Sequence, residues 1–220
     1  RVLSLLGADL PETLMPAARD NPTGFWEPLK LARLHDEILG NLGLAWDNPA
    51  PLPAAWASME SMASFRERYL ETLAGEYGES PLFVIKDPRT SRLLPLTKEI
   101  LQAQGIEPKF LITIRNPLEV AASLKARNDF HYSKSLLLWL VYTLEAERAT
   151  RGQARTFVLY DFLLNDWRGT VQKAVGDLRL ELPAWSARND ASVEEFLRAA
   201  LRHHAYTPED MEVREDVAEW

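Results

Sequence analysis

The chain has 220 residues, 46% of them hydrophobic, a net charge of −7 and no cysteine. This composition supports a substantial core in one globular domain, excludes disulfides and cysteine-ligated metals, and argues against nonspecific nucleic-acid binding but not against a small anionic ligand. No apolar run approaches the ~18 residues of a membrane span and no signal peptide is visible, so we expect no transmembrane segment and a cytoplasmic location.

The first half of the chain is predicted to be mostly helical. Helical patterns occupy residues 1–7, 29–42 and 54–77. Two loops with three prolines each separate them, at residues 9–24 and 45–53. Because proline interrupts both helices and strands, we expect surface loops at these two places.

Three short apolar runs predict buried strands. They cover residues 81–86, 110–114 and 155–160, and each is too short for a helix. Further helices are predicted over residues 93–104, from Pro117 onward, over 133–150, over 161–182 with a break near 168–169, and from an N-cap at Ser192 to about His204. Strands that alternate with such helices form βαβ units. We therefore predict a three-layer α/β fold, a short parallel sheet flanked by helices, with helical insertions.

Arg115 lies between a predicted strand and a predicted helix. Asn116 is a good N-cap, Pro117 suits the first helical position, and Glu119 completes a capping box. Ligands of open α/β sheets bind at the carboxyl ends of the strands, and helix N-termini favour phosphate. The sequence therefore predicts a phosphate site at Arg115.

Two further polar residues extend this predicted site along the helix. Ser123 lies seven residues, or two turns, after Asn116, and Arg127 follows one turn later. An arginine at a strand end with a serine and an arginine on one helical stripe could grip a phosphate. The alternatives are structural: Arg115 pairs with a neighbouring acid, Ser123 is a small packing residue, and Arg127 lies on a solvated face.

Several other kinds of site have no motif in this sequence. There is no G-x-x-x-x-G-K-[ST] phosphate loop, no G-x-G-x-x-G, no G-x-S-x-G elbow and no H-E-x-x-H. The adjacent histidines His203 and His204 would point in different directions on a helix, which makes a poor metal pair. The Arg115 turn is thus the main functional signal, and no metal site is expected.

The segment around Arg115 resembles the 3′-phosphate-binding segment of sulfotransferases that use 3′-phosphoadenosine 5′-phosphosulfate (PAPS). The resemblance is carried by a strand followed by Arg-Asn-Pro, with Ser123 eight residues after Arg115. Supporting segments are FVIKDPR at 83–89, TFVLYDFLLND at 156–166 and GFWE at 24–27, the last resembling bacterial members. The resemblance covers roughly residues 1 to 170 and implies a P-loop NTPase-like fold.

This resemblance implies a sulfotransferase that moves a sulfuryl group from PAPS to a hydroxyl or amine of a small molecule or glycan, without a metal. Arg115 and Ser123 would hold the 3′-phosphate of PAPS, and Arg127 would touch the nucleotide. Lys86 would stabilise charge on the transferring group. The family's 5′-phosphosulfate loop, with the strand before it, is not in this sequence and is expected to precede residue 1.

The acceptor needs a general base to take its proton, and two acids are candidates. Glu27 is preferred, because bacterial relatives place an acidic base in the loop after the first helix. Its structural alternative is a favourable position at the start of the helix from Pro28. Asp87 is the rival base because it follows Lys86 directly, although an Asp-Pro step is also ordinary turn chemistry.

Two other functions stay open from the sequence. One is a small-molecule or nucleotide kinase of the same architecture, which would need an upstream Walker-type lysine and acidic magnesium ligands. The other is a catalytically inactive sulfotransferase-like module that binds a nucleotide or a partner protein.

Overall fold

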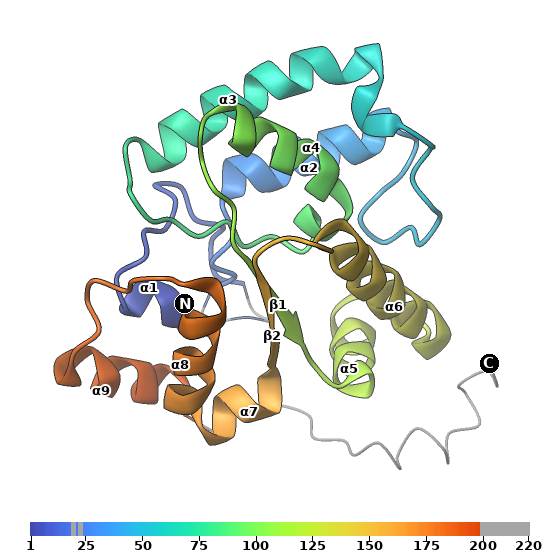
Figure 1. The fold of residues 1–220 in the computed structure, drawn as a ribbon. Coiled ribbons are helices and arrows are strands. Elements are labelled where there is room, and N and C mark those ends of the chain that lie inside the picture. Colours follow the sequence, from blue (N-terminus) through green and yellow to red (C-terminus); the bar gives the residue numbers. More distant parts are fainter. Residues whose placement is uncertain (19–20, 22–23, 199–220) are drawn as a thin grey trace. The chain divides into compact units, whose positions relative to one another are not determined.

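The computed structural model describes residues 1–18, 21 and 24–198 (Figure 1). They form two compact units: unit 1 comprises Arg1–Pro108 and Glu181–Val193, and unit 2 comprises Lys109–Leu180 with the described residues from Glu194 onward. The fold is a mostly helical α/β fold with a small two-stranded parallel sheet. The described residues thus confirm the predicted α/β class but show no clear three-layer, P-loop-like sheet.

Unit 1 is held together by an apolar core between three helices. They are α2 (Leu29–Asn41), α3 (Ala63–Tyr77) and α4 (Thr90–Ala103), and a short α1 (Val2–Leu5) comes first in the chain. Each helix presents apolar side chains three and four residues apart, which is the spacing of one helix face. The core side chains include Leu31, Leu34 and Ile38 of α2, Phe65, Tyr69 and Leu73 of α3, and Leu93, Leu96 and Ile100 of α4.

The long helix predicted over residues 54–77 is wrong in its first part. Two short 3₁₀ turns, Trp56–Ser58 and Glu60–Met62, precede α3. The backbone is left-handed at Ala55, with a φ of 52°, and extended at Met59. Neither conformation continues an α-helix, so the regular helix begins only at Ala63.

The strand predicted over residues 81–86 is also wrong as a regular strand. Only Phe83 pairs, through an isolated parallel bridge to Asp9. The Asp9 N–H donates to the Leu82 carbonyl at 2.8 Å, and the Val84 N–H donates to the Asp9 carbonyl at 3.0 Å. A strand needs a neighbour along its length, and in the described part of the chain this segment pairs with Asp9 alone.

Unit 2 contains the two predicted strands that do form, β1 (Phe110–Ile114) and β2 (Arg155–Leu159). They pair in parallel, with Phe110 opposite Arg155 and Ile114 opposite Leu159. Between them the chain crosses over through α5 (Pro117–Asn128) and α6 (Tyr132–Ala149). Both strands and α6 were predicted within one residue of these bounds, and the start of α5 at Pro117 was predicted correctly.

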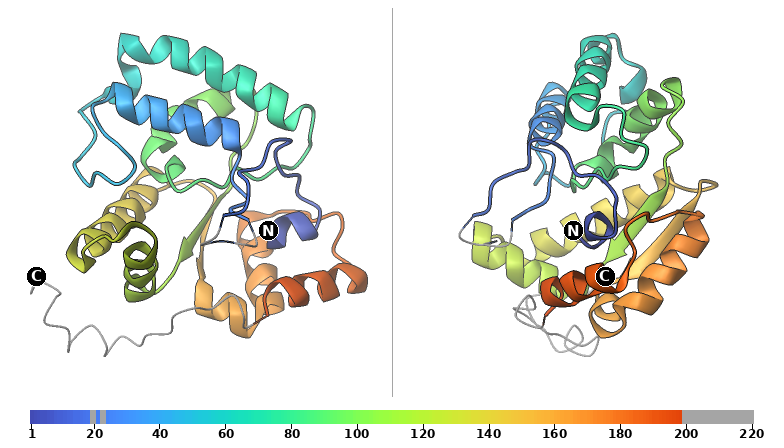
Figure 2. Two further views of the ribbon diagram at one scale, coloured as in Figure 1. Left: turned by 180° about the vertical axis from the view of Figure 1, so that it is seen from behind. Right: turned by 90° about the vertical axis from the view of Figure 1, so that its left-hand side faces the viewer.

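Helices lie on both faces of this small sheet (Figure 2). Thr156 of β2 donates from its hydroxyl to Asp177 of α8 (Trp167–Leu178) at 2.6 Å. Its neighbour Arg155 donates to the Glu147 carbonyl of α6 at 2.7 Å. Because successive strand residues face opposite sides, α6 and α8 lie on opposite faces of β2.

The predicted helix over residues 161–182 breaks at a different place from the one expected. It consists of α7 (Tyr160–Asn165) and α8, and the break falls at Asp166 instead of at residues 168–169. Asp166 accepts a hydrogen bond from the Gly169 N–H at 2.9 Å, so its side chain caps α8. The glycine therefore lies inside the first turn of α8.

The predicted N-cap at Ser192 is wrong. The last described helix, α9, spans Ala187–Phe196, so Ser192 lies inside it. Ser186 stands directly before α9, and its carbonyl accepts the N–H groups of Asn189 and Asp190, both at 3.0 Å. The expected end of this helix, with His203 and His204, lies outside the described residues.

No helix among the described residues has both the length and the apolar character needed to cross a bilayer. The longest of these helices, α6, contains an apolar run over residues 136–142. Leu136 and Leu138 are buried, but Leu140 and Leu144 are 44% and 49% exposed. The apolar side chains of α6 are therefore only partly buried.

Candidate functional site

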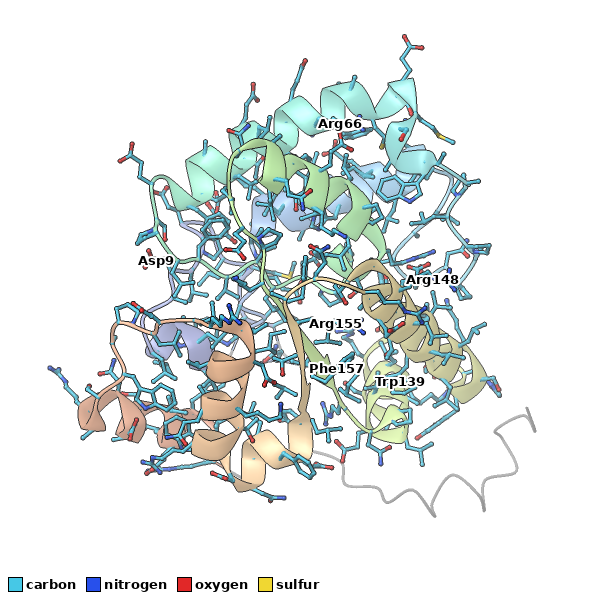
Figure 3. All side chains as sticks on the ribbon, viewed as in Figure 1. Asp9, Arg66, Trp139, Arg148, Arg155 and Phe157 are labelled. Atoms are coloured by element: carbon cyan, nitrogen blue, oxygen red, sulfur yellow. The ribbon has the colours of Figure 1, made fainter. Side chains whose placement is uncertain are left out.

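In unit 2, Arg115 follows the carboxyl end of β1 and precedes α5, as predicted. Its Nε–H donates to Glu119 Oε2 at 2.8 Å, and its guanidinium carbon lies 5.0 Å from the ring centroid of Tyr160. Trp139 of α6, labelled in Figure 3, donates from its indole N–H to the Arg115 carbonyl at 3.1 Å. Contacts from three elements thus fix both the backbone and the side chain of Arg115.

The first turn of α5 forms as its sequence predicts. Asn116 accepts a hydrogen bond from the Leu118 N–H at 2.9 Å, and Pro117 is the first helical residue. The Glu119 side chain is fully buried. A buried carboxylate requires a counter-charge, which Arg115 supplies.

Arg115 therefore has the structural role that the sequence left open, but this role does not use all of its donors. Only the Nε–H is engaged by Glu119, and the terminal N–H groups on Nη1 and Nη2 make no hydrogen bond to any residue in the described ranges. The side chain is 30% exposed. One arginine can thus neutralise Glu119 and still bind an external anion.

Ser123 and Arg127 continue from Glu119 along one face of α5. The three residues are spaced four apart, which places them on successive turns of the same face. Ser123 is exposed, and within the described part of the chain its hydroxyl has no hydrogen-bond partner. Arg127 is exposed, and its Nε–H donates to Asn128 at 2.8 Å.

In unit 1, the structure brings Glu27 and Lys86 together although 59 residues separate them in the sequence. Lys86 Nζ donates to Glu27 Oε1 at 2.7 Å and to the Phe25 carbonyl at 3.0 Å. Arg89 Nη1 lies 3.7 Å from the other oxygen of Glu27. The Glu27 side chain is largely buried, whereas Lys86 is 51% exposed. The predicted base thus touches the predicted sulfuryl-stabilising lysine.

Asp87 is placed differently from Lys86, its neighbour in the chain. Its side chain is fully buried. Oδ2 lies 2.6 Å from His35 Nδ1, and Oδ1 accepts from Arg89 Nη1 at 2.6 Å and from the Arg89 N–H at 3.2 Å. Burial alone would raise the pKa of Asp87, but the hydrogen bond from His35 and the charge of Arg89 outweigh it and hold the pKa below its ordinary value.

His35 is a residue that the sequence analysis missed. It lies four residues after Leu31 and three before Ile38, on the apolar face of α2. A histidine at such a position must find polar partners in the core, and this is the signal that could have identified it. Its partners are Asp87 and, at 3.3 Å from Nε2, the Tyr69 hydroxyl.

The predicted site residues fall into two groups, one in each unit. Glu27, Lys86 and Asp87 belong to unit 1, and the three α5 residues belong to unit 2. No cluster of three histidine or acidic side chains suited to a metal ion occurs within residues 1–18, 21 and 24–198. Comparison with known proteins adds no family: no protein-family model, no curated protein and no solved structure matches the chain.

Proposed function

We propose that the chain is a PAPS-dependent sulfotransferase acting on a hydroxyl or amine of a small molecule or glycan. The observation that carries the proposal is Arg115, whose terminal N–H groups make no hydrogen bond to the part of the chain that the structure describes. They lie at the carboxyl end of a parallel strand, and Ser123 follows on α5. An arginine fork suits the oxygens of a phosphate, so the residues present fit the 3′-phosphate of PAPS.

We also propose that β1 and β2 belong to a larger, P-loop NTPase-like parallel sheet. Two observations support this. The strands are parallel and joined by a helical crossover, as in βαβ units. The bridge between Asp9 and Phe83 is parallel as well, although it is confined to one pair of residues.

Of the two candidate bases, the contacts favour Glu27. Asp87 is fully buried, and both of its oxygens accept hydrogen bonds from His35 or Arg89. It is therefore committed to the fold. Glu27 instead contacts the half-exposed Lys86, so one of its partners reaches the protein surface.

The pairing of Glu27 with Lys86 suggests how the two residues act. When bound, PAPS supplies the sulfuryl group and leaves as adenosine 3′,5′-bisphosphate. Lys86 Nζ turns from Glu27 Oε1 toward the negative charge of that group and stabilises it. Glu27, which then keeps only the more distant Arg89 as a counter-charge, takes the proton from the acceptor hydroxyl or amine.

Calorimetry on the full-length protein tests this proposal. We expect micromolar binding of adenosine 3′,5′-bisphosphate and much weaker binding of ATP, because the Arg115 group would recognise the 3′-phosphate that ATP lacks. Equal affinities, or a preference for ATP with magnesium, would contradict the proposal and favour a kinase. Tight binding of the bisphosphate without sulfuryl transfer to any acceptor would favour an inactive, nucleotide-binding module.

A further inference from the structure

In unit 1, a series of buried polar contacts connects three helices to the turn that contains Lys86 and Asp87. His35 of α2 is fully buried, with Nδ1 2.6 Å from Asp87 Oδ2. Its Nε2 lies 3.3 Å from the Tyr69 hydroxyl of α3, which lies 3.3 Å from the Thr97 hydroxyl of α4. Three helices and the turn that contains Asp87 are thereby joined.

The protonation states in this chain follow from its charges. The pKa of Asp87 lies below its ordinary value, so Asp87 is an ionised acceptor and His35 Nδ1 must carry the proton. Burial raises the pKa of Tyr69, so its phenol keeps its proton. The Nδ1 N–H of His35 therefore donates to a buried, ionised carboxylate and anchors Asp87.

Asp87 in turn fixes the backbone from which the side chains of Lys86 and Arg89 extend. Lys86 precedes it directly, and Arg89, two residues later, donates to Asp87 Oδ1 from both its backbone N–H and Nη1. Arg89 Nη1 also lies 3.7 Å from Glu27 Oε2. A circuit therefore closes from Asp87 through Arg89 and Glu27 to Lys86 and back to Asp87.

We propose that His35 is a positioning residue for the Lys86–Glu27 pair and acts through Asp87. A histidine that merely filled the core would be replaceable by an apolar side chain of similar volume, since buried polar pairs add little net stability over such a replacement. Here the donor on Nδ1 holds the carboxylate that fixes the Lys86 turn. The consequence for catalysis rests on the proposed sulfuryl transfer, whereas the consequence for the Lys86–Glu27 contact does not.

Two amide substitutions distinguish the contact at Nδ1 of the His35 ring from the contact at Nε2. His35→Asn keeps a donor near the Nδ1 position, facing Asp87. His35→Gln moves its amide toward the Nε2 position, facing Tyr69, and loses the donor to Asp87. Tyr69→Phe is the matched control, because it removes the contact at Nε2, together with the hydroxyl contact to Thr97, and leaves the contact with Asp87 in place.

The first readout is sulfuryl transfer by the full-length protein. We expect His35→Gln to lower kcat on the order of 10²-fold, the effect of a small displacement of a catalytic group, with the KM for PAPS unchanged. His35→Asn and Tyr69→Phe should stay within about 3-fold of the original kcat, since a weak buried contact is worth little. Equal losses in both His35 variants would overturn the inference and leave a core-filling role.

The second readout does not depend on activity. The acetylation rate of the Lys86 amine, measured by mass spectrometry, should rise several-fold in His35→Gln because the Glu27 contact is loosened, and should not change in His35→Asn or Tyr69→Phe. If no acceptor is ever sulfated, the proposed function fails, and the labelling rates alone decide the positioning role. Unchanged labelling in His35→Gln would reject it.

A reciprocal measurement covers the case in which the His35 variants do not fold. In Glu27→Gln, the resonance of the His35 Nδ1 proton should shift relative to the unaltered protein, because the circuit through Arg89 and Asp87 is disturbed. Glu99→Gln, at an exposed glutamate of unit 1 paired with Arg66, serves as the control and should leave this resonance in place. An unmoved resonance in Glu27→Gln would contradict the inference.

Discussion

The charged side chains of the two units are arranged in opposite ways. In unit 1, Glu27, Lys86, Asp87 and Arg89 pair with one another, and each cation has a carboxylate within 2.7 Å. In unit 2, Arg115 engages Glu119 through its Nε–H alone, and its terminal donors meet no partner within the described ranges. One cluster neutralises itself, and the other keeps unused donors.

This difference indicates a division of work. Within the described ranges no residue accepts a hydrogen bond from the terminal N–H groups of Arg115, so the proposed anion site there is preorganised. A ligand that uses Lys86 must compete with Glu27 for the same amine. Under the proposed function, the ligand therefore gains its interaction with Lys86 only as negative charge develops on the reacting group. Interactions that strengthen in the transition state accelerate a reaction. Under the proposed function, we therefore assign binding to Arg115 and chemistry to Glu27 and Lys86.

The largest effect is expected from Glu27→Gln. Without a carboxylate to accept the proton, kcat should fall by about 10²–10⁴-fold, the usual contribution of a general base. Affinity for adenosine 3′,5′-bisphosphate should be retained, because that affinity is assigned to unit 2. A sulfuryl-transfer assay and calorimetry on the same preparation give both numbers.

The control for Glu27 is Asp36→Asn. Asp36 is an exposed acid that also pairs with Arg89, at 2.6 Å from its Nε, so the change removes a comparable charge without removing the proposed base. Activity should remain near its original level. Retained turnover in Glu27→Gln would transfer the role of base elsewhere, with Asp87 first in line.

Asp87→Asn should mainly affect stability. It leaves Arg89 and His35 facing a neutral amide, and breaking a buried ion pair costs about 3–5 kcal/mol. Urea unfolding followed by tryptophan fluorescence measures this loss. Asp129→Asn is the matched control, because the pKa of Asp129 is also lowered, by Lys125, but at a fully exposed position; we expect little change there.

The stability that Asp87 contributes should depend on pH in a defined direction. Its pKa in the folded protein lies below the ordinary value of 3.8, so the unfolded chain takes up the proton first as the pH falls. The contribution is complete above pH 3.8 and is lost as the pH falls through the folded-state pKa. The difference between the original protein and Asp87→Asn should therefore shrink below this pH. A difference that is constant across it would show that Asp87 is not an ionised partner of His35 and Arg89.

The elements predicted correctly are those that local signals determine. The start of α5 needs only Asn116 as a cap and Pro117 as the first helical residue, and both signals lie within one turn. The strand over residues 81–86 fails because its formation depends on a partner distant in sequence, and only Asp9 pairs with it in the described part of the chain.

The candidate site follows the same rule. Arg115 and Ser123 were found because strand, cap and helix spacing are local. The contact of Glu27 with Lys86 could not be derived from spacing, since the two residues are 59 positions apart. Glu27 was a candidate as the base by resemblance, and Lys86 by resemblance and by its place at the end of the strand predicted over residues 81–86. His35 was missed because its role depends on Asp87, 52 residues away.

Arg115→Ala tests the binding side of the comparison. The loss of a charge-assisted hydrogen bond should weaken adenosine 3′,5′-bisphosphate binding by about 1.5–3 kcal/mol, or roughly 10- to 150-fold in Kd. Turnover at saturating PAPS should fall less than in Glu27→Gln. Calorimetry and steady-state kinetics provide the measurements.

Two controls accompany this substitution. Glu119→Gln removes the buried carboxylate that Arg115 neutralises and should leave nucleotide affinity largely intact, so the binding loss in Arg115→Ala cannot be attributed to that pair. Arg151→Ala removes an exposed arginine of unit 2 that is paired with Glu147 at 2.8 Å, and binding should not change. Unchanged binding in Arg115→Ala would show that Arg115 is not part of the binding site, and it would contradict the proposed difference between the two units.

The smallest effect, and the sharpest test of the comparison, is expected from Ser123→Ala. One neutral hydrogen bond is worth about 0.5–1.5 kcal/mol, so Kd should rise roughly 2- to 12-fold. Alanine is a better helix former than serine, and Ser123 is exposed on α5, so the protein should not lose stability and unfolding cannot explain a weaker affinity. Ser123→Thr keeps the hydroxyl and should bind like the original protein. If Ser123→Ala also binds like the original, the unused donors of Arg115 act alone, and the eight-residue interval between the two residues carries no information about a 3′-phosphate.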